Sequence, residues 1–130
     1  MDFAACAADR RPDFYRLTAA TELGAVGGVI LSDGGRPLEN TTVTLYRKGS
    51  GRIGSQKTNA SGAFQFVGLR IQSEEYWLSI EREGFFAEEQ RHLLVMPGLE
   101  SVYSPIWMES CSLGHCQAHL KTIPVIAPCA

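Results

Sequence analysis

Residues 27–86 constrain the fold most, because short apolar runs alternate there with turn-forming residues. Residues 63–67 place Phe64 and Phe66 on one face, as expected for a half-buried strand. The preceding residues 59–62 begin with asparagine and end with glycine, which suits a tight turn. A period of two residues, interrupted by such turns, indicates β-strands and not helices.

Seven short segments are expected to be strands because of their length, their alternation and the turn residues between them. They are residues 25–32, 42–47, 53–58, 63–67, 75–82, 92–95 and 101–108. Residues 13–18 could form a further short strand or a strap along the body, and Phe85 and Phe86 are expected to close one end of the core. Pro105 predicts an edge position for the last strand, because proline cannot donate a ladder hydrogen bond. The chain contains no convincing amphipathic helix, so the pattern predicts an antiparallel all-β sandwich.

The length and charge of the chain narrow its class. Its 130 residues are enough for one domain with a buried core. The net charge of -2 gives no electrostatic reason to expect nucleic acid or an anionic membrane as a partner. No apolar run approaches the ~20 residues of a membrane-spanning helix, and no signal peptide is predicted in this chain.

Several phrases of the sequence resemble carboxypeptidase regulatory-like domains. They occur in the family's order at residues 28–32, 35–41, 43–45, 58–66, 68–69, 76–80 and 83–85. The resemblance covers residues 24–109 and implies a seven-stranded, Greek-key β-sandwich of the transthyretin-like type. Residues 1–23 are then an N-terminal extension, and residues 110–130 are a C-terminal tail; both ends carry cysteines.

The resemblance also implies a function. Members of this family are usually non-catalytic modules attached to exported peptidases, outer-membrane receptors and adhesive or carbohydrate-active proteins. We therefore expect a non-catalytic, extracytoplasmic module with a structural, accessory or binding role, which contacts protein or carbohydrate and needs no cofactor. Three positions depart from the family pattern: Ser32 and Asn59 replace aspartates, and Thr41 replaces a small apolar residue. All three are turn or packing positions.

The four cysteines all lie outside residues 27–86. We predict that Cys111 pairs with Cys116 as a small loop and that Cys6 pairs with Cys129 as a terminal clasp, although four cysteines allow three full pairings. Disulfides of this kind fit an oxidising compartment. The alternative is four free thiols in a reducing cell.

One cluster has metal-ligand character. Cys111, His115, Cys116 and His119 supply two thiolates and two imidazoles, a donor set that zinc accepts. They crowd into nine residues, whereas structural zinc sites usually split two ligand pairs across a longer loop. A disulfide with two exposed histidines is the preferred interpretation, and a small metal-binding protein or metal-dependent enzyme is the alternative function.

An enzyme hypothesis also follows from the histidines. Intradiol ring-cleaving dioxygenases use a similar sandwich and bind iron through two tyrosines and two histidines. The chain supplies these residue types at Tyr46, Tyr76, Tyr103, His115 and His119. It lacks the close His-x-His pair of that family, and it lacks the H-E-x-x-H and G-x-S-x-G motifs of other enzymes. No catalytic residue is predicted.

Trp77 and Trp107 lie out of phase with the predicted core residues of their strands. They could form an exposed aromatic surface for a glycan or a protein partner. The alternative is that they cover a second small core beneath the chain ends.

Overall fold

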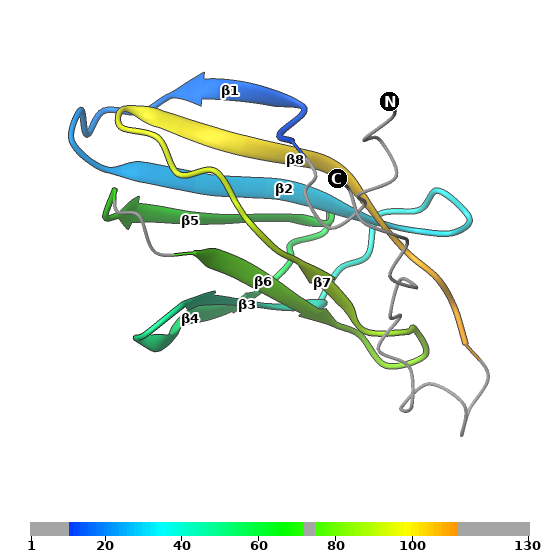
Figure 1. Ribbon diagram of the computed structural model, residues 1–130. Helices are drawn as coiled ribbons and strands as arrows, with labels where there is room; N and C mark the ends of the chain where they lie inside the picture. The colour runs from blue at the N-terminus through cyan, green and yellow to red at the C-terminus, as the bar shows by residue number, and fades with distance from the viewer. Residues whose placement is uncertain (1–10, 72–74, 112–130) are drawn as a thin grey trace, which may run out of the picture.

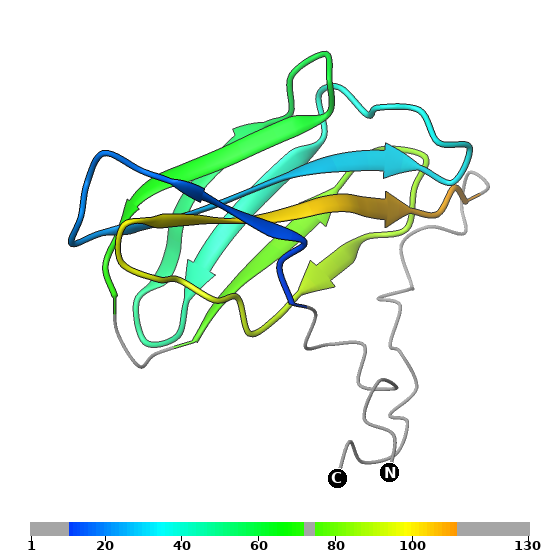
Figure 2. The same ribbon diagram turned by 90° about the horizontal axis from the view of Figure 1, so that it is seen from above.

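Two four-stranded sheets pack face to face in the computed structural model, which describes residues 11–71 and 75–111 (Figure 1). The strands of sheet A, in order across the sheet, are β1 (Phe14–Leu17), β8 (Leu99–Met108), β2 (Gly24–Ser32) and β5 (Ala63–Leu69). The strands of sheet B, in order, are β4 (Gly51–Lys57), β3 (Thr42–Arg47), β6 (Tyr76–Glu81) and β7 (Glu88–Gln90). Seen from above, the strands of the two sheets cross at an angle, as in a twisted sandwich (Figure 2).

The core lies between the two sheets and is built by every second residue of the strands. Sheet B contributes aliphatic side chains that are fully buried: Val43, Leu45, Leu78 and Ile80. Sheet A contributes Val26, Ile30, Phe64, Phe66, Tyr103, Ile106 and Met108. Full burial of such a side chain is worth about 1.5–3 kcal/mol, so this layer is the main source of stability. Phe85 packs against one margin of the core, as the sequence predicted.

The predicted all-β sandwich is confirmed, with two differences in its sheets. The described residues form eight strands instead of seven, because residues 14–17 join sheet A by pairing with residues 99–102 of β8. The predicted pattern was antiparallel throughout, but β2 and β8 pair in parallel. A parallel pair requires a long crossover connection, and the strands of sheet B together with β5 supply it.

The strand predicted at residues 92–95 is wrong. His92 has a positive φ of 57°, which interrupts an extended backbone. The strand in this region is instead β7, whose residues 88–90 pair with residues 78–80 of β6. The sequence before His92 is acidic and polar, so its alternation was too weak to predict this strand.

The predicted edge position of β8 is also wrong, because β8 lies between β1 and β2. Pro105 is nevertheless tolerated inside the sheet, because neither neighbouring strand requires a hydrogen bond from its backbone nitrogen. Strand β1 pairs with β8 only as far as Val102, so no β1 carbonyl lies opposite Pro105. The pairing of β2 with β8 changes register between Gly28 and Ile30, which is opposite the same proline.

Two of the residues that depart from the family pattern, Ser32 and Asn59, still supply a side-chain oxygen to the turns in which they lie. Ser32 Oγ accepts hydrogen bonds from the backbone N–H of Gly34 (3.1 Å) and of Arg36 (3.2 Å). Asn59 Oδ1 accepts from the N–H of Ser61 (2.9 Å) and of Ala63 (3.0 Å). Serine and asparagine therefore perform the acceptor role that aspartate would perform in these turns.

Thr41, the third residue that departs from the family pattern, forms hydrogen bonds inside the same end of the sandwich. Its hydroxyl donates to the carbonyl of Leu38 (3.1 Å), and its backbone N–H donates to Thr58 Oγ1 (2.9 Å). Thr58 Oγ1 also donates to the carbonyl of Leu38. Both threonines are buried, so these bonds satisfy polar groups inside the turn region.

We predict that Gly62→Ala destabilises the protein much more than Gly49→Ala. Both glycines have a positive φ, 76° and 87°, which costs alanine about 1–2 kcal/mol. A Cβ at Gly62 would also collide with the carbonyl oxygen of Ile30, whereas a Cβ at Gly49 meets open space. Chemical denaturation should give a loss of about 3 kcal/mol or more for Gly62→Ala and about 1 kcal/mol for Gly49→Ala. Equal losses would contradict this assignment of the turn.

Candidate functional site

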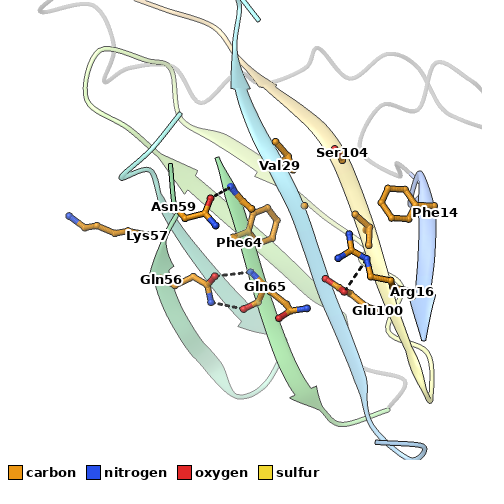
Figure 3. A pocket seen from close by; sticks show the side chains of 13 residues that line it. Phe14, Arg16, Val29, Gln56, Lys57, Asn59, Phe64, Gln65, Glu100 and Ser104 are labelled. Atoms are coloured by element: carbon orange, nitrogen blue, oxygen red, sulfur yellow. Dashed lines mark hydrogen bonds and ion pairs between the residues drawn. The ribbon is translucent and has the colours of Figure 1, made fainter. Parts of the chain in front are cut away.

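A hollow of about 490 Å³ opens on the outer face of sheet A, the face directed away from sheet B (Figure 3). Phe14 and Arg16 of β1 line it on one side, and Gln65 of β5 lines it on the other. Its floor is β2, which contributes Gly28 and Val29. Side chains alternate between the two faces of a strand, so the missing side chain of Gly27 bares the outer face, whereas that of Gly28 would be directed at the core ring of Phe64.

Glu100 of β8 is the one carboxylate that lines this hollow in the described part of the chain. Glu100 is only 4% exposed, and its Oε2 occupies the place that a Cβ at Gly27 would fill. Its ionic partner is Arg16, whose Nε lies 3.8 Å from Oε1. That distance is too long for a hydrogen bond, and the Arg16 side chain is 61% exposed. Arg16 also lies over the Phe14 ring, with its guanidinium carbon 5.4 Å from the ring centroid.

On the opposite side of the hollow, the side chain of Gln56 forms hydrogen bonds with the backbone of β5 like those of a neighbouring strand. Gln56 of β4 donates through Nε2 to the carbonyl of Gln65 (2.6 Å) and accepts at Oε1 from the N–H of Gln65 (2.7 Å). Because β5 is an edge strand of sheet A, these bonds cover part of its open edge and link it to sheet B. The Gln65 side chain itself remains exposed at the hollow.

A second arrangement lies on the outer face of sheet B. Tyr46 of β3 and Trp77 of β6 are register partners, and their rings stack with centroids 5.3 Å apart. Arg91, which follows β7, lies over the Trp77 ring with its guanidinium carbon 4.4 Å from the centroid. Since β6 lies between β3 and β7, Tyr46 and Arg91 cover opposite faces of the indole.

Glu75 fixes the position of Arg91 in this stack. Its two oxygens accept from Arg91 Nη2 (3.0 Å) and Nε (3.1 Å), a bidentate geometry. The hydrogen bonds from Arg91 lower the pKa of Glu75, and the same bonds raise the pKa of Arg91. Both groups are therefore charged at neutral pH and stabilise the fold.

Asp33 has a comparable structural role at one end of the sandwich. Its Oδ2 accepts from the N–H (2.9 Å) and the hydroxyl (2.7 Å) of Ser110, which hold its pKa below the usual range. These bonds fasten the chain that leaves β8 to the turn that follows β2. The next residue, Cys111, donates its N–H to the carbonyl of Gly84 (2.9 Å).

The structure does not bring the two predicted surface tryptophans together. Trp77 points outward from sheet B, and both of its ring faces are covered by Tyr46 and Arg91. Trp107 points outward from sheet A and is 53% exposed. Trp107 therefore retains the accessible aromatic surface that the sequence predicted, and a binding role for either tryptophan stays a prediction.

The three tyrosines proposed for an iron site are also apart. Tyr76 and Tyr103 are buried in the core, while Tyr46 lies on the outer face of sheet B. The Tyr76 hydroxyl donates to the carbonyl of Arg70 (2.8 Å), and the Tyr103 hydroxyl accepts from the N–H of Leu94 (3.1 Å). These two hydroxyls bind backbone groups, which is the usual arrangement for a structural tyrosine.

Most of the predicted cysteine and histidine cluster lies outside the described residues. Only Cys111 is described, and it carries no free thiol. The others are Cys6, His115, Cys116, His119 and Cys129, so both disulfide pairings and the alternative zinc site stay predictions. In residues 11–71 and 75–111, no three His, Cys, Asp or Glu side chains are grouped as metal ligands. The same residues include no helix long and apolar enough to cross a membrane.

The sequence model of one protein family matches residues 25–104, more than half of the chain. Its description is carboxypeptidase regulatory-like domain. The chain belongs to this family. A comparison with curated protein sequences gives no match.

Solved structures agree with the transthyretin-like sandwich of this carboxypeptidase regulatory-like domain. Catechol 1,2-dioxygenase from Pseudomonas arvilla C-1 has a TM-score of 0.59 at 9% identity, over 78% of this chain and 57% of that chain. The 5-hydroxyisourate hydrolase of Klebsiella pneumoniae has a TM-score of 0.51 at 24% identity, over 68% of this chain and 92% of that chain. The shaft pilin SpaA of Lactobacillus rhamnosus GG has a TM-score of 0.52 at 11% identity, over 70% and 47%. At these identities the likeness concerns the fold alone, and this chain spans only about half of the dioxygenase and of the pilin.

The residues around the hollow of this carboxypeptidase regulatory-like domain were not predicted from the sequence. Gly27 and Gly28 lie inside the strand predicted at residues 25–32, but no role was assigned to them. Glu100 was missed because β8 was expected to begin at residue 101. The signal that was available is the pair of adjacent glycines inside an apolar run, since glycine within a strand often marks a close approach by another group.

We predict that Glu75→Gln lowers the free energy of unfolding by about 1 kcal/mol at pH 7, because it breaks the ion pair with Arg91. The pKa of Glu75 is lower in the folded than in the unfolded state, so this contribution is complete above the ordinary value of 4.5 and is lost as the pH falls through the folded value. Denaturation at several pH values should show the difference from wild type shrinking in acid. Glu81→Gln, at the exposed end of β6, which follows Glu75, is the control. A difference that stays constant with pH would contradict the assignment.

We also predict different accessibilities for the two tryptophans. In Trp77→Phe the remaining fluorophore is Trp107, which is 53% exposed, and in Trp107→Phe it is the stacked Trp77. Acrylamide should quench the emission of the first variant several-fold more strongly than that of the second. Equal quenching constants would contradict the stacking of Tyr46, Trp77 and Arg91.

Proposed function

We propose that this carboxypeptidase regulatory-like domain is a non-catalytic, extracytoplasmic module with an accessory or binding role, and that it makes contact through the outer face of sheet A. The observation that carries the proposal is the aromatic exposure on that face. Phe14 is 46% exposed and Trp107 is 53% exposed, and the hollow is lined by Phe14 and lies on the same face. Exposed aromatic side chains beside a polar depression are typical of surfaces that contact a partner.

The perturbed acids of the domain support a non-catalytic role. A general acid or base works best when its pKa lies near the working pH. Hydrogen bonds from Ser110 and Arg91 instead lower the pKa of Asp33 and of Glu75, away from neutrality. Both carboxylates hold segments of the chain together, and such ion pairs and caps are structural devices.

Two observations support an oxidising compartment. The family to which residues 25–104 belong is expected to occur mainly in exported proteins, and Cys111 carries no free thiol. Disulfides persist in secreted, periplasmic and cell-surface proteins and are rare in the cytosol. We keep the division into an extension of residues 1–23, a domain of residues 24–109 and a tail of residues 110–130 as part of this proposal, with β1 as an edge strand that the extension adds to the domain.

The alternative function is metal binding by Cys111, His115, Cys116 and His119. Metal analysis and thiol titration of the purified full chain separate the two proposals. We expect four oxidised cysteines and less than stoichiometric metal. Stoichiometric zinc or iron together with free thiols would overturn the proposed function in favour of the alternative.

A further inference from the structure

Glu100 has unused capacity to accept hydrogen bonds. It is 4% exposed, and its one polar partner among the described residues is Arg16, at 3.8 Å. Buried carboxylates normally accept several hydrogen bonds, because an ionised group without them loses much of its solvation. The carboxylate lines the open hollow, so a bound molecule can supply the donors that the protein does not (Figure 3).

The Glu100 carboxylate can occupy its position only because residue 27 is a glycine. Any side chain at Gly27 would occupy the position of Glu100 Oε2. The backbone of β2 is close-packed at this point, since a Cβ at the next residue, Gly28, would meet the carbonyl of Tyr103 and the ring of Phe64. A carboxylate is thus held against a bare stretch of backbone in the middle of an outer sheet face, where a solvated glutamate would ordinarily extend into water.

The neighbouring side chains add donors, an acceptor and an apolar surface. Gln65 extends toward Glu100 over β2 from the opposite side of the strand, and its amide offers both a donor and an acceptor (Figure 3). Arg16 offers donors beside the carboxylate. The Phe14 ring is 46% exposed at the rim and offers an apolar face.

The charges around the hollow favour a neutral ligand. Among the described residues, its lining has one acid, Glu100, and two bases, Arg16 and Lys57, so a cation meets one excess positive charge. An anion that approached Arg16 would lie beside the Glu100 carboxylate. A neutral molecule that carries several hydroxyl groups avoids both costs, because each hydroxyl can donate to Glu100 and accept from Arg16 or Gln65.

We infer that the hollow beside Glu100 binds one pyranose unit of a neutral carbohydrate. Hydroxyl groups of the sugar donate to the Glu100 carboxylate and accept from Arg16 and Gln65, while its C–H face packs against Phe14. The volume of about 490 Å³ lies in the ~300–1,000 Å³ range of small-molecule sites. An open hollow that contacts so small a ligand corresponds to a Kd of about 1 mM. This inference rests on the proposed function, because it uses the contact face proposed there.

The test is a titration of the ¹⁵N-labelled full chain with the methyl glycosides of glucose, galactose, mannose and N-acetylglucosamine. For at least one glycoside, the backbone amides of Gly27, Gly28 and Gln65 should shift saturably with a Kd of about 1 mM. Glu100→Gln should weaken this binding about tenfold, because hydrogen bonds to a charged acceptor are stronger than those to an amide.

Matched variants separate binding from folding. Glu81→Gln removes an exposed carboxylate from sheet B and should leave Kd unchanged. Phe14→Leu changes only the exposed rim of the hollow and should weaken binding several-fold, with a melting temperature near that of wild type. If Glu100→Gln does not fold, the Phe14→Leu result alone decides the question.

Three results would overturn the inference. They are the absence of saturable shifts at these amides with every glycoside, full affinity in folded Glu100→Gln or Phe14→Leu, and binding of benzylamine at the hollow without binding of any glycoside. The last result would assign the site to a cationic ligand. None of them bears on the proposed function, which fails only if the purified chain holds stoichiometric metal and free thiols.

Discussion

Burial of one aliphatic layer between the two sheets determines the rest of this structure. Side chains alternate along a strand, so placing Leu78 and Ile80 in the core necessarily turns Trp77 outward. The same constraint in β8 places Ile106 and Met108 inside and Trp107 outside. A shift of one residue in either strand would expose the aliphatic layer, at a cost of several kcal/mol. The positions of the surface aromatics are therefore consequences of the core.

The outer face of sheet A shows how a sheet can combine stability with a depression. A strand interior that contains two adjacent glycines loses side-chain packing and is weakened by about 0.5–1 kcal/mol per residue relative to alanine. In β2 this cost is offset by neighbours on both sides, since β5 and β8 pair with the glycine stretch. The absence of a side chain at Gly27 also leaves the space that the Glu100 carboxylate occupies. Alanine at Gly27 would displace the Glu100 carboxylate, and alanine at Gly28 would collide with the carbonyl oxygen of Tyr103.

Local patterns in the sequence were sufficient to predict the sandwich but not to predict its candidate site. Residues 42–47 and 63–67 alternate cleanly, and both form strands whose apolar residues face the core. Strand β7 escaped prediction because residues 88–90 are polar and form a strand only through pairing with β6. The hollow escaped prediction for a related reason. Its groups come from five strands, and the parallel pairing of β2 with β8, which brings Gly27 beside Glu100, is a long-range property that no local pattern specifies.

Two carboxylates of low exposure differ in their surroundings, and this difference supports the proposed binding hollow. Glu75 accepts two hydrogen bonds from Arg91, with both atoms at about 3 Å, so its acceptor capacity is largely used within the fold. Glu100 is less exposed than Glu75, yet its nearest cation lies at 3.8 Å and is itself mostly in solvent. A carboxylate with Glu75's partners stabilises the protein whether or not a ligand is present. The Glu100 carboxylate faces an open hollow, where water or a bound molecule can supply the donors that the protein does not.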